Sequence, residues 1–569
     1  MLNPKIIIML GILSSTFGWS AVAAPLSVDT NKREASRNFY NGVYRFSSGI
    51  PAEWQGDISL CDAGRTAQSF TDATLLRVNY YRAMAGIPAQ ISFNDEFNTK
   101  ALLASVMMSA NQQLSHHPTE AWLCHTPAGI EAAGNSNLAL GSTGPKAIDD
   151  LMFDWGDNNA AVGHRRWILF PGTRVMGVGN IEPPTDSEYP ATQALWIIDE
   201  GAWTRPRPST RDGFVSWPPP GYTPRGLIPD RWSFAWPDAD FSQATVTVQS
   251  EDSIIPTTLE PLSEGFGDNT LAWVTDLSAR PTTQDARYSV TIDNVRIQGK
   301  AQRFEYAVIF FDPDQTGKDT VLPTITKGLS RIKAGTETRY AMRKVPGATN
   351  YQWFAVHATA FNTLNGAESG LGDLTPDPTL DDYPHISNEV HASGQNAYHL
   401  AQTDQQTRSL IFSDFLVPTA RSSLQFMSRL GWATEEQSAD VDISTDEGRT
   451  WTTLYHQSGT HSAGETAFNR KTVNLSAYAN RIIRLRFHYG SERRFYPQTQ
   501  AGVGWYLDNI RLSRVFKADE NPTPQPAKAN QFTYSPPAPG QYFLSTRALM
   551  FKQYPLEWTR LKPITVLSE

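Results

Sequence analysis

Histidines at two places in the chain are the side chains best suited to chemistry. His116 and His117 are adjacent, and His164 follows much further along. Two neutral imidazoles together with a carboxylate can hold Zn²⁺ and leave one coordination position open for water. Such a water loses a proton near neutral pH and becomes a nucleophile. Because no His-Glu-x-x-His helix fixes these histidines locally, their convergence depends on the fold.

Four stretches around these histidines follow one another in a set order. They are residues 79–88 (NYYRAMAGIP), 114–118 (LSHHP), 129–139 (GIEAAGNSNLA) and 163–179, which begins GHRRWIL and ends MGVG. This order resembles the CAP superfamily, which includes cysteine-rich secretory proteins, insect antigen 5 and plant pathogenesis-related proteins. The resemblance covers residues 60–200. It implies an α-β-α sandwich with a central cleft.

The resemblance also implies which side chains face that cleft. Many CAP domains place two histidines and two acids there. The first histidine corresponds to His116, with His117 as its competitor, and the second corresponds to His164. Asp154 is the best match for one acid, and Asp157 is the alternative. A Zn²⁺ ion is the cofactor that such a set implies.

The second acid departs from the family pattern. Family members often carry Gly-Glu-Asn before the central strands, where this chain has Asn135-Ser136-Asn137. Ser136 therefore stands at the position of the acid, and the nearby Glu131 is the substitute that we expect as a metal ligand. The remaining candidates for contacts with a ligand are His117, Ser136, Asn137 and Arg165.

A purely structural interpretation of the same residues stays open. His164 could donate a hydrogen bond that joins a helix to the sheet, and His116 with Pro118 could simply end a helix. Arg165 could pair with an acid such as Asp150. In that interpretation the motifs maintain the fold and carry no chemistry.

The N-terminus predicts export. Lys5 precedes the apolar run Ile6–Leu13, and Ala21-Val22-Ala23 forms a small-x-small cleavage site. Residues 1–23 are therefore predicted to be a signal peptide, and the mature protein to be secreted or periplasmic. The alternative, a membrane anchor, requires a longer apolar run, and we expect no membrane span further along the chain.

Cysteine content and charge narrow the function further. The chain has two cysteines, Cys61 and Cys124, which we expect to form a disulfide in an oxidising compartment. A metal-binding pair is the alternative, but the Cys-x-x-Cys spacing is absent from the sequence. The formal net charge of −8 argues against a nucleic-acid partner.

Hydrophobic spacing predicts an α+β chain. Apolar residues recur at helical spacing within residues 71–84 and 94–108, and a third helix is expected over 145–153. Short strands are expected at 167–170 and 194–198. These elements would build the N-terminal α-β-α sandwich.

The composition changes after residue 200, where β-sandwich and jelly-roll modules are expected. Residues 217–221 read as a rigid proline-rich linker, followed by an immunoglobulin-like β-sandwich over 228–314. Residues 380–515 suit a jelly roll. The flanks, 325–375 and 530–569, are each too short for a core of their own. We expect them to pair as one fibronectin-like domain into which the jelly roll is inserted.

Three functions follow from this organisation. The first is a binding protein whose cleft and β modules hold an extracellular glycan, lipid or protein. The second is a metal-assisted hydrolase or peptidase that uses the cleft histidines. The third is a structural adhesin with a closed cleft. Trp432, Trp451 and Trp505 are candidates for stacking on sugars, although Trp451 and Trp505 are expected in the core.

Overall fold

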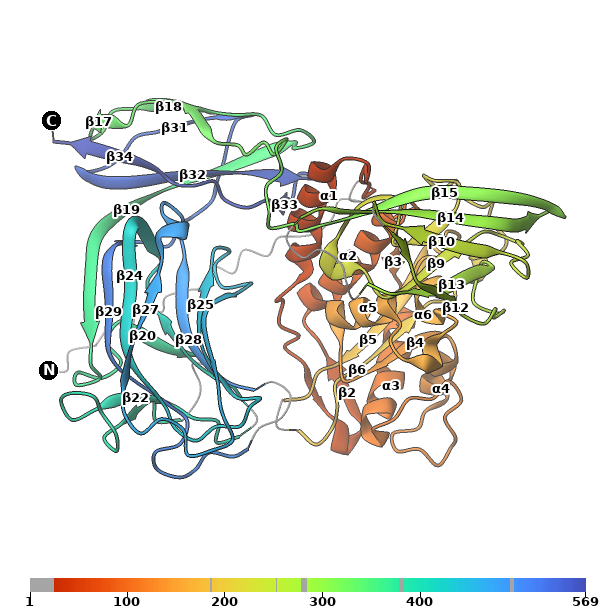
Figure 1. Ribbon diagram of the computed structural model, residues 1–569, viewed down its shortest axis with the longest axis horizontal. Coiled ribbons are helices and arrows are strands. Elements are labelled where there is room, and N and C mark those ends of the chain that lie inside the picture. The colour runs from red at the N-terminus through yellow and green to blue at the C-terminus, as the bar shows by residue number, and fades with distance from the viewer. Residues whose placement is uncertain are drawn as a thin grey trace, which may run out of the picture.

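The structure is a computed structural model that describes residues 25–184, 187–251, 253–277, 284–377, 383–404, 406–491 and 496–568 (Figure 1). The predicted signal peptide, residues 1–23, lies outside the described residues. None of the helices in the described part of the chain combines the length and the apolar character needed to cross a lipid bilayer.

A four-stranded sheet with helices on both faces forms the first domain, which we call the α-β-α domain. Its strands lie in the order β3 (Ser92–Phe93), β5 (Val175–Ile181), β6 (Thr192–Trp196) and β4 (Ser136–Leu140). One face packs on α2 (Gln68–Met84) and α5 (Gly144–Phe153), and the other packs on α3 (Asp95–Asn111) and α4 (Pro127–Gly134). The predicted α+β class and α-β-α layering are confirmed.

Helix α3 lies unusually close to the sheet because two strand positions are glycine. A Cβ atom on Gly179 would lie 2.1 Å from the backbone nitrogen of Leu102, and one on Gly177 would lie 2.4 Å from the Cβ of Phe97. At this short separation the Ser105 hydroxyl donates to the carbonyl of Gly179 at 2.9 Å. The close approach therefore fixes the first half of α3 against β5.

The strand predicted over residues 167–170 is wrong. Helix α6 (Gly163–Ile168) covers the start of this run instead, after Val162 in the left-handed region with φ 46°. A four-residue apolar run fits one turn of a buried helix as well as it fits a strand, so its spacing could not decide between them. Helix α2 also begins earlier than predicted, at Gln68.

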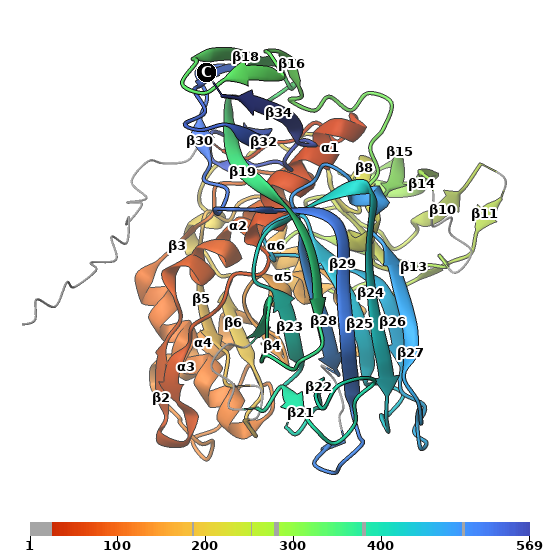
Figure 2. The same ribbon diagram turned by 90° about the vertical axis from the view of Figure 1, so that its left-hand side faces the viewer.

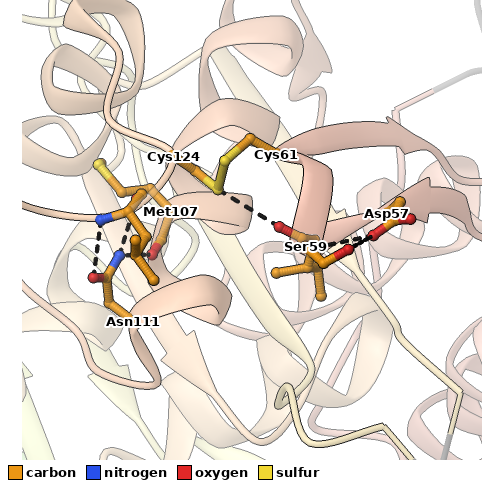
Figure 3. Close-up of a disulfide and its surroundings, with 8 residues drawn as sticks. Asp57, Ser59, Cys61, Met107, Asn111 and Cys124 are labelled. Carbon is orange, nitrogen blue, oxygen red and sulfur yellow. Dashed lines mark hydrogen bonds between the residues drawn. A yellow bond between two sulfur atoms is a disulfide. The ribbon is translucent and has the colours of Figure 1, made fainter.

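The predicted disulfide between Cys61 and Cys124 is present (Figure 3). It joins the segment between β1 (Gln55–Asp57) and β2 (Asp62–Arg65) to the loop between α3 and α4. The Asp57 carboxylate accepts the backbone N–H of Ser59 at 2.9 Å on one side of the bridge. The bridge therefore holds down the long loop that also carries His116.

The small β-sandwich has two sheets, in the orders β12-β13-β9-β7 and β11-β10-β14-β15-β8. The linker predicted at residues 217–221 is wrong, because this segment contributes to two strands, β7 (Val215–Trp217) and β8 (Gly221–Pro224). Both are edge strands, where proline removes no necessary ladder hydrogen bond. The other strands are β9 (Arg231–Ala235), β10 (Thr245–Gln249), β11 (Ile254–Ile255), β12 (Thr257–Leu259), β13 (Thr270–Thr275), β14 (Ala286–Ile297) and β15 (Lys300–Phe311).

One long strand connects the two C-terminal modules. The first half of β19 (Asn350–Asn365) pairs with β32 (Gly540–Met550), and the second half pairs with β29 (Trp505–Ala518) of the jelly roll (Figure 2). The segments on either side of the jelly roll also pair elsewhere, through β18 (Thr338–Met342) and β31 (Gln531–Tyr534). Parallel pairing of β17 (Arg331–Lys333) with β34 (Lys562–Leu567) adds a third link.

The jelly roll packs a five-stranded sheet, in the order β20-β23-β28-β25-β26, against β22, β24, β27 and β29. Trp505 is fully buried in its core, as expected, whereas Trp451 is half-buried under the guanidinium of Arg486. The strands are β20 (Leu374–Asp377), β22 (Ala397–Leu400), β23 (Arg408–Phe412), β24 (Leu416–Leu430), β25 (Ser438–Ser444), β26 (Thr452–Ser458), β27 (Asn469–Asn474) and β28 (Arg484–Gly490).

The start of the described chain joins the α-β-α domain to the C-terminal strands. Helix α1 (Arg33–Phe39) places the ring of Phe39 4.9 Å from Tyr80 of α2 and 6.0 Å from Phe551, measured between ring centroids. The buried guanidinium of Arg37 pairs with Glu557 at 2.6 Å. Helix α1 therefore packs between helix α2 and the C-terminal segment that contains Phe551 and Glu557.

Removing the disulfide should destabilise the α-β-α domain. The bridge spans 63 residues, and closing a loop of that size in the unfolded chain is worth about 4 kcal/mol. The double substitution Cys61→Ser/Cys124→Ser should therefore speed hydrogen exchange in α3 and α4, measured by mass spectrometry. Wild-type protein reduced with dithiothreitol should match the variant. Unchanged exchange in both samples would contradict the prediction.

Candidate functional site

Two adjoining cavities lie beside α6 in the α-β-α domain. Their volumes are about 580 Å³ and about 460 Å³, and we call them the first lobe and the second lobe. His116, His164, Asn158 and Asn159 line both cavities, so the two lobes form one cleft with these four side chains at its middle.

His164 is held by a buried carboxylate. Its Nδ1 lies 2.6 Å from Oδ1 of Asp154, whose side chain is 0% exposed. The other oxygen of Asp154 accepts the backbone N–H of Arg165 at 3.2 Å. Asp154 follows α5 in the left-handed region, which turns its side chain toward α6. Because Nδ1 carries the proton toward the carboxylate, Nε2 is the acceptor of the neutral ring.

His116 is oriented in the same manner by the opposite wall of the cleft. Its Nδ1 lies 2.9 Å from the backbone carbonyl of Ala133 in α4. A carbonyl oxygen only accepts, so Nδ1 is the donor and Nε2 is again the acceptor. His117, its competitor in the sequence, lines the second lobe but not the first. His116 is therefore the histidine that shares both lobes with His164.

Ser136 and Asn137 both line the second lobe. The side-chain amide of Asn137 donates to the backbone carbonyl of His164 at 2.9 Å, so Asn137 fixes α6 against β4. The hydroxyl of Ser136 is buried and makes no hydrogen bond within the described part of the chain. Ser136 therefore brings no negative charge to the position where the family often has an acid.

Two predicted site residues do not reach the cleft. Glu131 pairs with Lys100 at 3.0 Å on the exposed side of α4. The prediction that Glu131 is a metal ligand of the cleft is therefore wrong. Arg165 is buried and donates to the carbonyls of Met152 at 2.6 Å and Phe153 at 3.0 Å, so its assignment to ligand contact is also wrong. Neither is among the described residues that line the lobes.

Arg165 instead joins two domains. Besides the end of α5, its guanidinium reaches the carbonyl of Arg231 in β9 at 2.9 Å and the hydroxyl of Ser233 at 3.2 Å. Burial lowers the pKa of Arg165 to about 10, so the side chain stays charged at neutral pH. The expected pairing of Arg165 with Asp150 is not observed, because Asp150 pairs with Lys146 at 3.0 Å.

The donor set does not fit a catalytic zinc ion. Such an ion takes three protein ligands and a water, whereas the cleft offers two imidazole nitrogens. Both oxygens of Asp154 already accept hydrogen bonds, and Ser136 is neutral. Across the described residues, no group of three or more histidine, cysteine, aspartate or glutamate side chains could hold a metal ion.

The cleft contains residues that sequence reasoning missed. Gly265 and Phe266 belong to the loop between β12 and β13 of the small β-sandwich, yet both line the second lobe. Asn158 and Asn159 were also missed. Phe266 lies in a different domain from the histidines, and no local pattern marks it.

A second hollow of about 710 Å³ lies at one end of the jelly roll. His399 lines it, with Nε2 2.8 Å from the carbonyl of Val503 and its ring stacked on Tyr506 at 4.1 Å between centroids. Burial lowers the pKa of His399, which keeps the imidazole neutral at pH 7. Amide side chains such as Asn388 and Asn396 complete a largely polar lining.

Comparison with protein families identifies the first domain. Residues 75–194 match the model of the cysteine-rich secretory protein family, CAP, and this stretch is therefore a CAP domain. The match covers α3, α4, α5, α6, β4 and β5 in full and parts of α2 and β6. No curated protein sequence matches the chain.

Solved structures resemble parts of the chain weakly. The K1 cleaved adhesin domain of Lys-gingipain from Porphyromonas gingivalis W83 is 15% identical, covering 29% of this chain and 99% of that one, with a TM-score of 0.19. A structure of carbohydrate-binding modules from the β-sandwich superfamily is 13% identical, covering 52% and 96%, with a TM-score of 0.16. SGBP-B from a xyloglucan utilization locus in Bacteroides uniformis is 10% identical, covering 50% and 95%, with a TM-score of 0.17. At such scores their ligands are not transferred to this chain.

Replacing Arg165 should destabilise the CAP domain and its contact with the β-sandwich. Arg165→Met removes the donors to the carbonyls of Met152, Phe153 and Arg231, and leaving such buried acceptors unpaired costs about 3 kcal/mol or more. Urea unfolding should show the loss. Arg174→Met, which changes an exposed arginine of the same domain, is the matched control. Equal midpoints for the two variants would contradict the structural role of Arg165.

Proposed function

We propose that this chain, which carries a CAP domain at residues 75–194, is a secreted or periplasmic binding protein. Its CAP cleft would hold an extracellular glycan, lipid or protein ligand. The observation that carries this proposal is the pair of imidazoles, His116 and His164, which line both lobes while their Nδ1 atoms are engaged by protein acceptors.

The chemistry of the cleft suits binding. Two imidazole acceptors at the middle can receive N–H or O–H donors of a ligand, and each such bond contributes roughly 1 kcal/mol. Apolar side chains around them, among them Leu138 and Leu151 in the first lobe and Ile198 in the second, bury the less polar parts of the same molecule. Few convergent polar groups within an apolar wall are typical of a ligand site.

The β modules would attach the protein to a cell surface or matrix. The hollow beside His399 offers a second surface of mostly polar character for a glycan or protein partner. The alternative function, a structural adhesin, predicts a closed cleft. The two lobes, of about 580 and 460 Å³, favour an open, ligand-holding cleft instead.

A metal-assisted hydrolase is the second candidate. The Nδ1 hydrogen bonds of His116 and His164 are of the kind that orients metal-bound histidines. However, the two carboxylates that line the cleft are already engaged, Asp154 by His164 and the backbone of Arg165 and Asp150 by Lys146, so we rank hydrolysis below binding.

Binding should depend on the cleft histidines. The mature protein would be screened on arrays of glycans, lipids and peptides, and His116→Ala/His164→Ala should weaken capture of the retained ligand roughly tenfold or more, since two hydrogen bonds are lost. His456→Ala, which alters a largely exposed histidine of the jelly roll, should leave capture unchanged. If the double variant binds as well as wild type, the cleft is not the ligand site.

Zinc should not be retained in stoichiometric amount. With two imidazoles as the available ligands, we expect weak zinc binding that desalting removes. The measurement is elemental analysis of the mature protein after incubation with zinc and gel filtration. Retention of one zinc per chain, lost in His116→Ala/His164→Ala, would instead revive the hydrolase and call for a peptide substrate screen with and without chelator.

A further inference from the structure

The small β-sandwich is fastened to the helix that carries the cleft histidine. Arg166 of α6 donates to the backbone carbonyls of Ser263 at 2.9 Å and Asp268 at 3.0 Å, which are the two ends of the sandwich loop. We use the name sandwich loop for residues 263–268. Arg207 pairs with the carboxylate of Asp268 at 2.7 Å. The CAP domain therefore holds this loop at both ends.

Phe266, in the middle of the sandwich loop, packs directly beside His164. Gly163 directly precedes His164 in α6. A Cβ atom on Gly163 would lie 2.9 Å from the Phe266 ring, so the ring lies on the backbone of α6. The guanidinium of Arg166 covers the same ring at 5.3 Å from its centroid. Phe266 is half-buried and lines the second lobe together with Trp167 and Ile198.

A second set of contacts fixes the angle between the two domains. Arg231 of β9 donates to the carbonyls of Asp154 at 2.8 Å and Gly156 at 3.1 Å, and it also pairs with Glu260 at 2.7 Å. Glu260 lies between β12 and the sandwich loop. Arg231 therefore links the segment just before the sandwich loop to the CAP domain, which adds to the contacts that position Phe266.

We infer that the ligand cleft is completed by the β-sandwich, and that it accepts an extended peptide whose side chain in the second lobe is selected by Phe266. This inference rests on the proposed function and adds to it the ligand class and a residue that sets specificity. Gly163, at the foot of the Phe266 ring, has no side chain, and the ring occupies the space where one would lie.

The distribution of polar and apolar groups favours a peptide. The first lobe has the apolar walls of Leu138, Leu140, Leu151 and Trp155, and the second has those of Trp167, Ile197, Ile198 and Phe266. Imidazole acceptors and asparagine amides lie between them. An extended peptide matches this order, because its side chains alternate on two sides while its backbone carries amide donors and acceptors.

The charge of the cleft argues against anionic ligands. Among the described residues that line the lobes there is no lysine or arginine, whereas Asp150 and Asp154 are present. A neutral sugar chain would supply hydroxyl groups for the histidines but no alkyl groups to fill the leucine-lined first lobe. Of these ligands, the peptide is the one that uses both lobes.

The test uses an array of N-acetylated, C-amidated nonapeptides, each with two apolar side chains at varied separation, probed with the mature full-length protein. Phe266→Ala should weaken the best wild-type peptide on the order of tenfold, because it removes apolar contact area. It should also shift the preference at one position toward larger side chains. Phe266→Trp, which retains an aromatic ring over α6, should shift that preference toward smaller ones.

Leu262→Ala is the matched control, since it shortens an exposed apolar side chain next to the sandwich loop. Its peptide profile should equal that of wild type. If His116→Ala/His164→Ala abolishes binding while both Phe266 variants keep the wild-type affinity and preference, the cleft binds but the sandwich is no part of it, and the inference fails alone. Capture of glycans or lipids with no peptide retained would overturn the ligand class.

Discussion

The buried carboxylate of Asp154 is the interaction on which the site depends. It is enclosed by protein, so its charge must be met by donors that the fold supplies. One donor is the imidazole of His164, and another is the backbone of Arg165. The backbone carbonyl of Asp154 also accepts a hydrogen bond from Arg231 of the β-sandwich. Orientation of the cleft histidine and attachment of the next domain therefore converge on one residue.

Arginines extend this arrangement across the domain boundary. Arg165 and Arg166 point their guanidinium groups at backbone carbonyls of the sandwich, and Arg231 points back at carbonyls of the CAP domain. Burial lowers the pKa of Arg165 and of Arg166 to about 10 each, so both remain charged at neutral pH. A planar, rigid set of donors against fixed carbonyls defines one relative position of two domains more narrowly than an apolar contact would.

The parts predictable from sequence are those with local signals. Helical spacing located α2, α3 and α5, and motif order brought His116, His164 and Asp154 together. Glu131 and Arg165 were misplaced, because spacing along the chain does not reveal which way a helical side chain turns or whether a guanidinium is buried. Phe266 was missed for a different reason: its role arises only when a loop of another domain packs on α6.

The division of the cleft between two domains has a consequence for selectivity. The CAP part carries the histidines and their buried support, and changes there disturb hydrogen bonds on which the fold relies. Besides the ion pair of Asp268 with Arg207, the sandwich loop is held by two backbone carbonyls, which every residue type supplies, so the side chain at position 266 can vary without loss of those bonds. The cleft thus combines histidines that cannot be substituted without loss of hydrogen bonds with a sandwich loop whose side chain at position 266 can be substituted. Substitutions in the loop can therefore change which ligand binds while the histidines make the same hydrogen bonds.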